Sequence, residues 1–523
     1  MQRYKNSQKL FSAFLQGAEL LQDNVVSTFG PQGRNVIIAD EELIITKDGV
    51  TVAKHVEADD DFENMAVHVL RQAAHETNKM AGDGTTTSII LATAILQEAA
   101  KYLLTHHSLR DLQREMNEAL QFADDKLKEY TEHITAEEQL LHIATMAANG
   151  DKSIGKLITD ALKKAGKGGT VTIDQARSME TKLKVEDGFR IPSGLLSKSF
   201  CTDPVKEILR YENPLILVTD YTINSSEMLA YVDAYNRTSG VLEQVAAVST
   251  HPPLLIFAED VSGTALAMLI MNTVRGTMRC AAIKPPSYGE HRQEILTDLA
   301  MATGAKYISA TKGHILEDVK LADLGRARRV EATAFSTTIL GGDGDWKQID
   351  EKVAALKEQI AASDDLELCK RLQDRVLRLS SGIVIIQVGG HTETEAVEKK
   401  FRIEDALQAV LAAQDSGILP GGGVALLQIA QELLTTFDTF GARVLASALK
   451  VPFQALCASV EKAGLESNVN LQYGYDFSLM EPALVELKPA GIIDSYKVVA
   501  CALRNAFSAA TALLSANYSI VKT

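Results

Sequence analysis

A glycine-rich segment at residues 81–87, AGDGTTT, holds the residues best suited to chemistry, and an apolar helical run, SIILATAILQEAAKYLL, follows it. Two glycines let the backbone approach a ligand closely, and a helix N-terminus offers free N–H groups and a positive dipole end to a phosphate. Three hydroxyl groups add donors, and Asp83 is suited to hold a Mg²⁺ that bridges phosphate oxygens. The alternative is a helix cap after a tight turn, although β-branched threonines are mediocre helix formers. The segment is not a Walker A loop, because no Gly-Lys-Ser/Thr follows its glycines.

Two further glycine turns have a similar character. TFGPQG at residues 28–33 follows a helical stretch and offers backbone groups to a nucleotide, although a helix stop before a hairpin explains it equally well. LPGGG at residues 419–423 precedes the helical run VALLQIAQELL. Three adjacent glycines are costly in backbone entropy, which favours close approach to a ligand or to another backbone.

Three carboxylates are weaker candidates when each is taken alone. Asp48 lies in an Asp-Gly turn at the end of a strand, Asp405 lies in a charged helix, and Asp494 lies in GIIDSY. A turn, a solvated helix face and a second turn are the ordinary explanations of these positions. The 11 histidines form no HExxH pair and no cluster with cysteine, and no GxSxG elbow occurs. Zinc-enzyme and hydrolase functions therefore have no support.

The composition is that of a globular protein with an acidic balance. The 523 residues include 53 Lys and Arg against 68 Asp and Glu, a formal net charge of −15, and 46% of them are hydrophobic. This length is typical of about two to four domains, and the composition excludes a largely disordered chain. The charge argues against nucleic-acid binding, and the lack of an apolar span of about 20 residues argues against a membrane protein. The polar start and the scattered cysteines predict a cytoplasmic protein with free thiols.

The first 130 residues are predicted to form helices around one hairpin. The β-branched runs at 35–39 and 43–46 are typical of a strand pair. Ser108 and Asp111 have the spacing of a capping box, and leucines recur at helical intervals after them. This pattern predicts a long amphipathic helix.

The middle of the chain predicts an α/β fold, because apolar runs alternate with helical stretches. The runs lie at 214–220, 253–260, 280–286 and 306–311, and the helical stretches at 225–235, 263–274 and 294–304. Strands that are apolar throughout indicate a parallel sheet covered on both faces. A further strand at 383–390 precedes the helix of Asp405, and the last 100 residues are again helical. The helical ends either form separate domains or pack together around an inserted middle, and periodicity alone does not decide between these arrangements.

Taken together, these segments resemble the group I chaperonins, the GroEL-type bacterial chaperonins. The motifs that carry the resemblance are TFGPQGRNVII (28–38), ITKDGVTVAK (45–54), FENMAVHVLRQAA (62–74), AGDGTTT (81–87), IEDAL (403–407) and LPGGGVAL (419–426). AEDVSGTALAMLIMNTVRG (258–276) is similar to the helix that binds folding substrates in that family. The motifs keep their order along the chain, so the resemblance is far more specific than any one glycine loop.

The resemblance implies a multidomain α and α/β fold. Residues 1–129 and 416–523 would form a helical equatorial ATP-binding domain, 130–186 and 384–415 a small intermediate hinge domain, and 187–383 an inserted α/β apical domain. It also implies an ATPase that encloses unfolded polypeptides in a homo-oligomeric, seven-membered ring with a GroES-type co-chaperonin, without nucleic acid or membrane.

The resemblance also assigns a nucleotide site. It implies ATP as substrate, Asp48 and Asp405 as the catalytic carboxylates, Asp83 as the Mg²⁺ ligand, and K⁺ as a further cation. The positions that match ATP-binding residues are Thr28, Gly30, Pro31, Lys47, Asp83, Gly84, Thr85, Thr86, Thr87, Gly422 and Asp494. The adenine-side segment Asn-Ala-Ala of the family reads Asp-Phe-Ser at 476–478 in this sequence.

The surface that binds unfolded polypeptide is implied in the same way. Its positions are Leu195, Phe200, Leu229, Leu266, Ile270 and Met271. Departures occur, since two family aromatics are replaced by Leu195 and Ser199, and family Arg and Gly positions are Ser193 and Ser381. These departures identify a divergent paralogue, and leave a second hypothesis open: an ATP-binding oligomer that recognises one specific partner without general folding activity. A small-molecule kinase is the weakest alternative.

Overall fold

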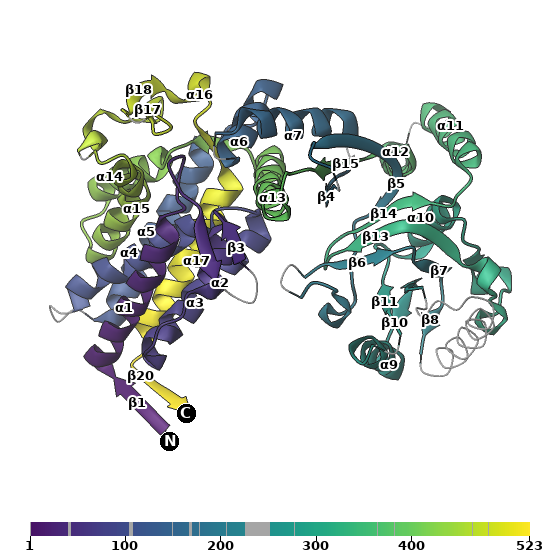
Figure 1. The fold of residues 1–523 in the computed structure, drawn as a ribbon, viewed down its shortest axis with the longest axis horizontal. Coiled ribbons are helices and arrows are strands. Elements are labelled where there is room, and N and C mark those ends of the chain that lie inside the picture. The colour runs from purple at the N-terminus through teal and green to yellow at the C-terminus, as the bar shows by residue number, and fades with distance from the viewer. Residues whose placement is uncertain are drawn as a thin grey trace. The chain divides into compact units, whose positions relative to one another are not determined.

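The computed structural model divides into two compact units, which we call the helical unit and the sheet unit. The helical unit comprises Met1–Asp160, Ile173–Lys182 and Gln387–Thr523, and the sheet unit comprises Ala161–Thr172 and Leu183–Ile386 (Figure 1). The described residues are 2–39, 43–103, 108–148, 150–166, 170–176, 178–204, 207–224, 252–276, 278–362, 365–380, 382–462, 464–479 and 481–522.

The helical unit is built from long helices supplied by both ends of the chain. Its helices are α1 (Ser7–Val26), α2 (Gly49–His55), α3 (Asp61–Ala81), α4 (Thr85–Leu103), α5 (Leu109–Tyr130), α6 (Glu137–Ala147), α13 (Glu393–Ser416), α14 (Val424–Thr436), α15 (Phe440–Ser459), α16 (Leu487–Ala490) and α17 (Tyr496–Ser515). Its two-stranded sheets are β1–β20 (Gln2–Asn6, Tyr518–Lys522), β2–β3 (Val36–Ala39, Leu43–Thr46), β16–β19 (Ile418–Pro420, Ile493–Ser495) and β17–β18 (Tyr473–Asp476, Ala483–Glu486). The predicted hairpin is thus confirmed as β2–β3.

The two ends of the chain pack together, which decides between the two arrangements left open by the sequence. Helix α17 packs on α3 and α4, and α15 packs on α4 and α5. Strands β1 and β20 pair in antiparallel register from Gln2↔Lys522 to Asn6↔Tyr518. The middle of the chain is therefore an insertion into one helical core.

Helix α17 is largely apolar because one side of it lies inside this core. Among the described residues it is the one helix long and apolar enough to cross a membrane, and core helices pass the same test. Leu503, Ala506 and Ala510 on α17 are each 0% exposed and belong to the core shared with α3 and α4. Its composition is accounted for by packing.

The predicted long helix after Ser108 is confirmed as α5, although its capping box does not form. Ser108 occupies the N-cap position in extended conformation, but its side chain makes no capping hydrogen bond. Leu112, Met116 and Leu127 are buried along one face. The apolar face, more than the cap, therefore stabilises this helix.

The sheet unit has the predicted parallel strands. They are β7 (Leu215–Thr219), β9 (Leu254–Phe257), β11 (Cys280–Ile283) and β12 (Tyr307–Ile308), each of which pairs in parallel with β7 or β9. Helix α9 (Gly263–Val274) packs on β11, and α10 (Gly289–Thr303) packs on β7. The helix predicted at 225–235, together with Leu229, lies outside the described residues.

An antiparallel extension of the sheet was not predicted. The sheet runs in the order β11-β9-β7-β13-β14-β5, and β6 also pairs with β13. The added elements are β5 (Lys182–Ile191), β6 (Leu209–Glu212), β13 (Gly325–Ala332) and β14 (Thr337–Gly342), followed by α11 (Trp346–Ala362) and α12 (Leu366–Ser380). Strand β15 (Gly382–Val388) confirms the strand predicted at 383–390. Strand β13, GRARRVEA, buries its small and apolar residues, whereas its arginines are more exposed. The arginines interrupt the apolar run from which a strand would be predicted.

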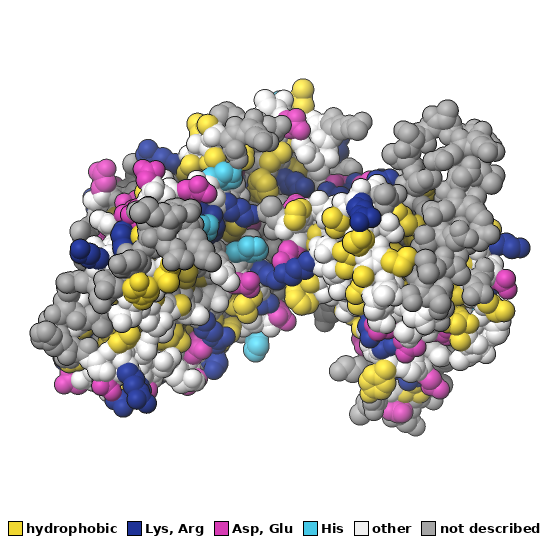
Figure 2. Space-filling view, turned by 90° about the horizontal axis from the view of Figure 1, so that it is seen from below, with side chains coloured by type: hydrophobic (Ala, Val, Ile, Leu, Met, Phe, Trp, Pro, Cys, Tyr) yellow, Lys and Arg dark blue, Asp and Glu magenta, His cyan; other side chains and the backbone are white. Residues whose placement is uncertain are grey.

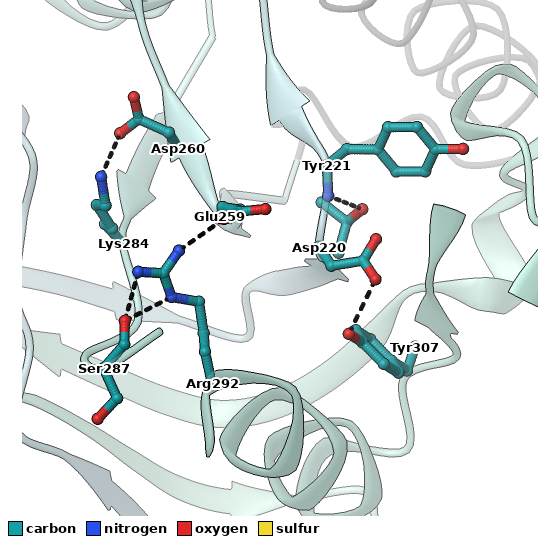
Figure 3. Close-up of polar contacts among 9 residues, drawn as sticks. Asp220, Tyr221, Glu259, Asp260, Lys284, Ser287, Arg292 and Tyr307 are labelled. Atoms are coloured by element: carbon teal, nitrogen blue, oxygen red, sulfur yellow. Dashed lines mark hydrogen bonds and ion pairs between the residues drawn. The ribbon is translucent and has the colours of Figure 1, made fainter. Parts of the chain in front are cut away.

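Polar residues at the carboxyl ends of the parallel strands pair with one another (Figure 3). Asp220, which follows β7, accepts hydrogen bonds from Ser309 Oγ at 2.5 Å and Tyr307 Oη at 3.1 Å. Two ion pairs lie at the same edge, Arg292–Glu259 at 3.1 Å and Lys284–Asp260 at 3.1 Å. Carboxyl edges of parallel sheets often bind ligands. Here the polar groups stabilise the loops that follow the strands.

A buried ion pair joins α10 to α12 in the sheet unit. Arg375 donates from Nε to Asp298 at 2.9 Å and from Nη2 to the same carboxylate at 2.6 Å. The Asp298 side chain is 0% exposed. A buried carboxylate depends on such a partner, because desolvation without one is expensive.

Arg375→Ala should destabilise the sheet unit by about 3–5 kcal/mol, because it leaves Asp298 buried and unpaired. Trp346, the only tryptophan, packs against the same core, so its fluorescence during urea unfolding reports on this unit. Lys306→Ala is the control, since the Lys306–Asp323 pair is long, at 3.7 Å, and the lysine is 52% exposed. That change should cost less than about 1 kcal/mol. Equal shifts of the unfolding midpoint in both variants would contradict a structural role for the buried pair.

Candidate functional site

A cavity of about 270 Å³ lies in the helical unit, and every residue predicted to bind or hydrolyse ATP lines it. The predicted residues along its wall are Thr28, Gly30, Pro31, Lys47, Asp48, Asp83, Gly84, Thr85, Thr86, Thr87, Asp405, Gly422 and Asp494. They come from loops, helices and a strand far apart in the sequence, so the fold alone brings them together.

The AGDGTTT segment forms a turn between two helices. Helix α3 ends at Ala81, Gly82 caps it with φ 75°, and α4 begins at Thr85 after Gly84 at φ 87°. Both glycines hold left-handed conformations that other residues adopt at a cost. The first N–H groups of α4 have no acceptor within the helix and lie at the cavity wall. This is the geometry expected of a phosphate site.

The loop after β3 lies directly against the start of α4. A Cβ on Gly49 would come within 2.4 Å of Thr86 Oγ1, so only glycine permits this approach. Asp48 caps α2, accepting from Val50 N at 3.0 Å and from Thr51 Oγ1 at 2.6 Å. The carboxylate of Asp48 therefore lies at the phosphate end of the cavity but is engaged as a helix cap. Its catalytic role stays a prediction.

Two carboxylates of the cavity resist ionisation. Burial raises the pKa of Asp83, and the charge of Asp48 raises it further, against a hydrogen bond from Gly84 N. Burial and the charge of Asp83 raise the pKa of Asp494 to about 7. Both carboxylates therefore hold a proton more readily than an exposed carboxylate does.

The donor set fits a Mg²⁺ that also takes ligands from phosphates. Within the described residues, no three His, Cys, Asp or Glu side chains are grouped to hold a metal by themselves. Mg²⁺ commonly uses one or two carboxylates together with substrate phosphates and water. Asp83, at the cavity wall beside the start of α4, is placed to supply such a carboxylate.

The LPGGG turn supports a further part of the cavity wall. Strand β16 pairs with β19, so that Leu419 lies opposite Asp494, and Gly422 N donates a hydrogen bond to the Asp494 carboxylate. A Cβ on Gly421 would come within 2.9 Å of the backbone of Ile492. The glycines therefore serve close approach to another backbone as well as to the cavity.

An apolar wall completes the cavity away from α4. It includes Phe29, Met146, Tyr475 and Phe477, and the Phe477 ring contacts Phe453 edge to face at 5.6 Å. The segment that departs from the family pattern thus places Phe477 in the core, where it is 4% exposed, and Asp476 at the cavity wall. This end suits a flat, largely apolar group such as a nucleobase.

Two lining residues, Glu398 and Arg402, were not predicted. On α13, Glu398 is four residues before Arg402, and Arg402 is three residues before Asp405, so all three lie on one helix face. That spacing is visible in the sequence, and it is the signal from which Glu398 and Arg402 could have been predicted.

Helix α9 in the sheet unit carries the predicted polypeptide contacts. Met271 is 49% exposed, whereas Leu266 and Ile270 are half-buried and pack against the core. Val274, which was not predicted, is 71% exposed one turn after Met271. Figure 2, which views this side, shows hydrophobic side chains gathered on the surface of the unit.

The prediction for Phe200 is contradicted. Its side chain is 0% exposed, because the turn Lys198–Phe200 packs on α9 and directs the ring into the core. Leu195 is half-buried, and its N–H donates to Thr333 O at 2.9 Å. The exposed apolar surface is therefore smaller than the sequence indicated.

The profile of the TCP-1/cpn60 chaperonin family matches residues 21–523. The fold is similar to that of the chaperonin gp146 from the bacteriophage EL 2 (Pseudomonas aeruginosa), crystallised in the presence of ATP-BeFx. The two chains share 20% sequence identity over 99% of each, with a TM-score of 0.69 in one crystal form and 0.63 in a second.

Asp494→Asn should stabilise the nucleotide-free protein more at pH 8 than at pH 5. Because the folded-state pKa of Asp494, about 7, lies above its ordinary value of 3.8, its favourable contribution is lost as the pH rises through 7. The gain is at most about 4 kcal/mol, since a pKa difference of about three corresponds to that free energy. Calorimetric Tm values from pH 5 to 8 measure it. Asp438→Asn is the control, with a carboxylate 92% exposed, and an Asp494→Asn effect independent of pH would contradict the raised pKa.

Proposed function

The chain belongs to the TCP-1/cpn60 chaperonin family, and from that premise we propose that it is an ATP-driven chaperone that captures unfolded polypeptides. The observation that carries the proposal is the cavity of the helical unit. It joins the N-terminus of α4, an amine from Lys47 and the carboxylates of Asp83 and Asp405 around one space. Phosphate binding, charge neutralisation and a general base are the parts that ATP hydrolysis requires.

The proposed chemistry places the ATP phosphates at the start of α4 and the adenine base of ATP at the apolar wall. Asp405 orients a water and accepts its proton as the water oxygen bonds to the terminal phosphorus. The bond from that phosphorus to the bridging oxygen breaks, and its electron pair stays on ADP. Mg²⁺, held by Asp83, would neutralise phosphate charge when bound. Lys47 contributes a fixed positive charge at the same end of the cavity.

Asp405→Ala should slow ATP turnover by at least about 10²-fold while ATP affinity changes only slightly, because the proton acceptor is lost but the phosphate contacts remain. Steady-state phosphate release and titration calorimetry measure the two quantities. Asp415→Ala on the same helix is the control, since Asp415 is 78% exposed and lies outside the cavity wall. Normal turnover in the Asp405 variant would remove this residue from the mechanism.

Polypeptide capture is assigned to the exposed face of α9. Met271 and Val274 supply apolar surface that a folded monomer has no reason to expose together. Met also suits partners of varied shape, because its side chain is flexible and polarisable. Half-buried Leu266 and Ile270 border this surface.

Met271→Glu and Val274→Glu should each reduce capture of a urea-denatured test protein while ATPase activity stays unchanged. Full burial of such a side chain contributes about 1.5–3 kcal/mol, and several copies act together in an oligomer. Cosedimentation with the denatured protein measures capture. Ile315→Glu is the control, since Ile315 is 56% exposed in the same unit but outside α9. Undiminished capture in both α9 variants would contradict this assignment.

A homo-oligomer is part of the proposal. The sheets β1–β20 and β2–β3 have two strands each, and Ile520 and Ile37 are 53% and 65% exposed on them. Two-stranded sheets are marginal alone, and open edges favour pairing with another chain. A seven-membered ring, a GroES-type co-chaperonin, K⁺ and a cytoplasmic location rest on the sequence resemblance and composition. Native mass spectrometry gives the subunit number.

The second candidate is an ATP-binding oligomer that recognises one specific partner. The burial of Phe200 favours it, because the exposed apolar surface on α9 becomes narrower. Capture of several unrelated denatured proteins would support the general chaperone, and capture of none with intact ATPase activity would support the specific-partner function.

A further inference from the structure

Arg402 occupies a position at the cavity that the nucleotide-site prediction did not include. It lies on α13 (Glu393–Ser416) three residues before Asp405, and both residues line the cavity. A guanidinium group is always charged and presents a planar fork of donors that matches phosphate oxygens. A guanidinium group at the cavity wall is therefore suited to bind a phosphate.

In the structure, carboxylates hold the Arg402 side chain. Nη2 donates to Glu398 Oε2 at 2.5 Å, and Nε donates to Glu398 Oε1 at 3.1 Å. Asp151 lies farther away, with Oδ2 at 3.7 Å from Nη1. Glu398 is 13% exposed and also lines the cavity, so the ion pair faces the space proposed for the nucleotide.

A second cation faces the same space. Lys47 has no hydrogen bond or ion pair with another described residue, and it lies in the segment that packs against Thr86 at the start of α4. Burial lowers the pKa of Lys47, and the nearby charge of Arg402 lowers it further, against the charge of Glu398, which raises it. Two cations that repel each other across a cavity form a site in which an anion is stabilised. The start of α4 identifies that end of the cavity as the phosphate end.

We propose that Arg402 exchanges Glu398 for the terminal phosphate of ATP and, opposite Lys47, stabilises the charge that develops there during hydrolysis. The exchange replaces one charge-assisted, forked contact by another, so the guanidinium stays paired throughout. An arginine within the same chain performs this task in some nucleotide hydrolases. The inference rests on the proposed ATPase function and adds a residue that touches the reacting phosphate.

The test compares ligands with and without a terminal phosphate. Arg402→Gln should bind Mg²⁺-ADP within about two-fold of the unchanged protein, but bind Mg²⁺-ADP with beryllium fluoride at least about 10-fold more weakly, since one charged hydrogen bond is lost. Turnover should fall by about 10²-fold or more. Arg402→Lys should recover part of the lost affinity, because it keeps the charge but not the fork. Normal ADP binding in the same variants shows that they are folded.

Variants of two residues next to Arg402 distinguish a contact with phosphate from a purely structural role of Arg402. Asp151→Asn removes a carboxylate near Arg402 that does not line the cavity, and it should leave the preference for the beryllium fluoride complex unchanged. Glu398→Gln should strengthen binding of that complex, because Arg402 is released and a repelling charge is removed.

The outcomes distinguish the inference from the proposed function. If Arg402→Gln weakens both ligands equally, or neither, Arg402 does not contact the terminal phosphate and the inference is overturned. The same holds if Asp151→Asn reproduces the Arg402→Gln pattern. If the unchanged protein binds neither ligand, the ATPase proposal itself fails.

Discussion

The site depends on side chains that pack directly against the backbone of glycines around the start of α4, where no Cβ fits. Gly49 lies against the Thr86 hydroxyl, Gly84 lies against Val498, and Gly82 lies against Gln408. A methyl group at Gly82 or Gly84 would push apart segments from the two ends of the chain, and one at Gly49 would push the loop after β3 away from the start of α4. The carboxylates and the amine of the cavity reach one another only because this contact is made. Packing and chemistry in the helical unit therefore share the same few residues.

Much of the site could be predicted because two segments that approach closely require glycine at the contact, and glycine is visible in the sequence. The glycines of residues 81–87 and 419–423 and the DG turn at Asp48 mark places where no side chain fits, and all of them line the cavity or support it. The position of Arg402 and Glu398 at the cavity was not evident from residue type, because charged residues on a helix usually face solvent. Phe200 was wrongly placed on the surface, since the sequence shows an aromatic residue but not the direction of its ring.

The fold divides in the same way between local and distant information. Hydrophobic runs with uniform character predicted β7, β9 and β11, because both faces of those strands are buried. Strand β13 escaped prediction, because arginines interrupt its apolar face. The packing of α17 on α3 depends on residues more than 400 positions apart, and no periodicity encodes such a contact. The three-domain division stays a prediction beside the two compact units.

The pairing of β1 with β20 has a consequence for how this chain folds during synthesis. Most of the sheet unit is one continuous stretch, Leu183–Ile386, whose contacts are complete before the last helices are made. The helical unit instead needs α17 packed on α3 and α4, so its core stays open until that helix has been made. Contacts between residues so far apart in the sequence form slowly, and apolar helices that stay exposed until then are prone to aggregate. The helical part of the nascent chain thus exposes, until α17 is made, the kind of apolar surface that the finished protein is proposed to capture.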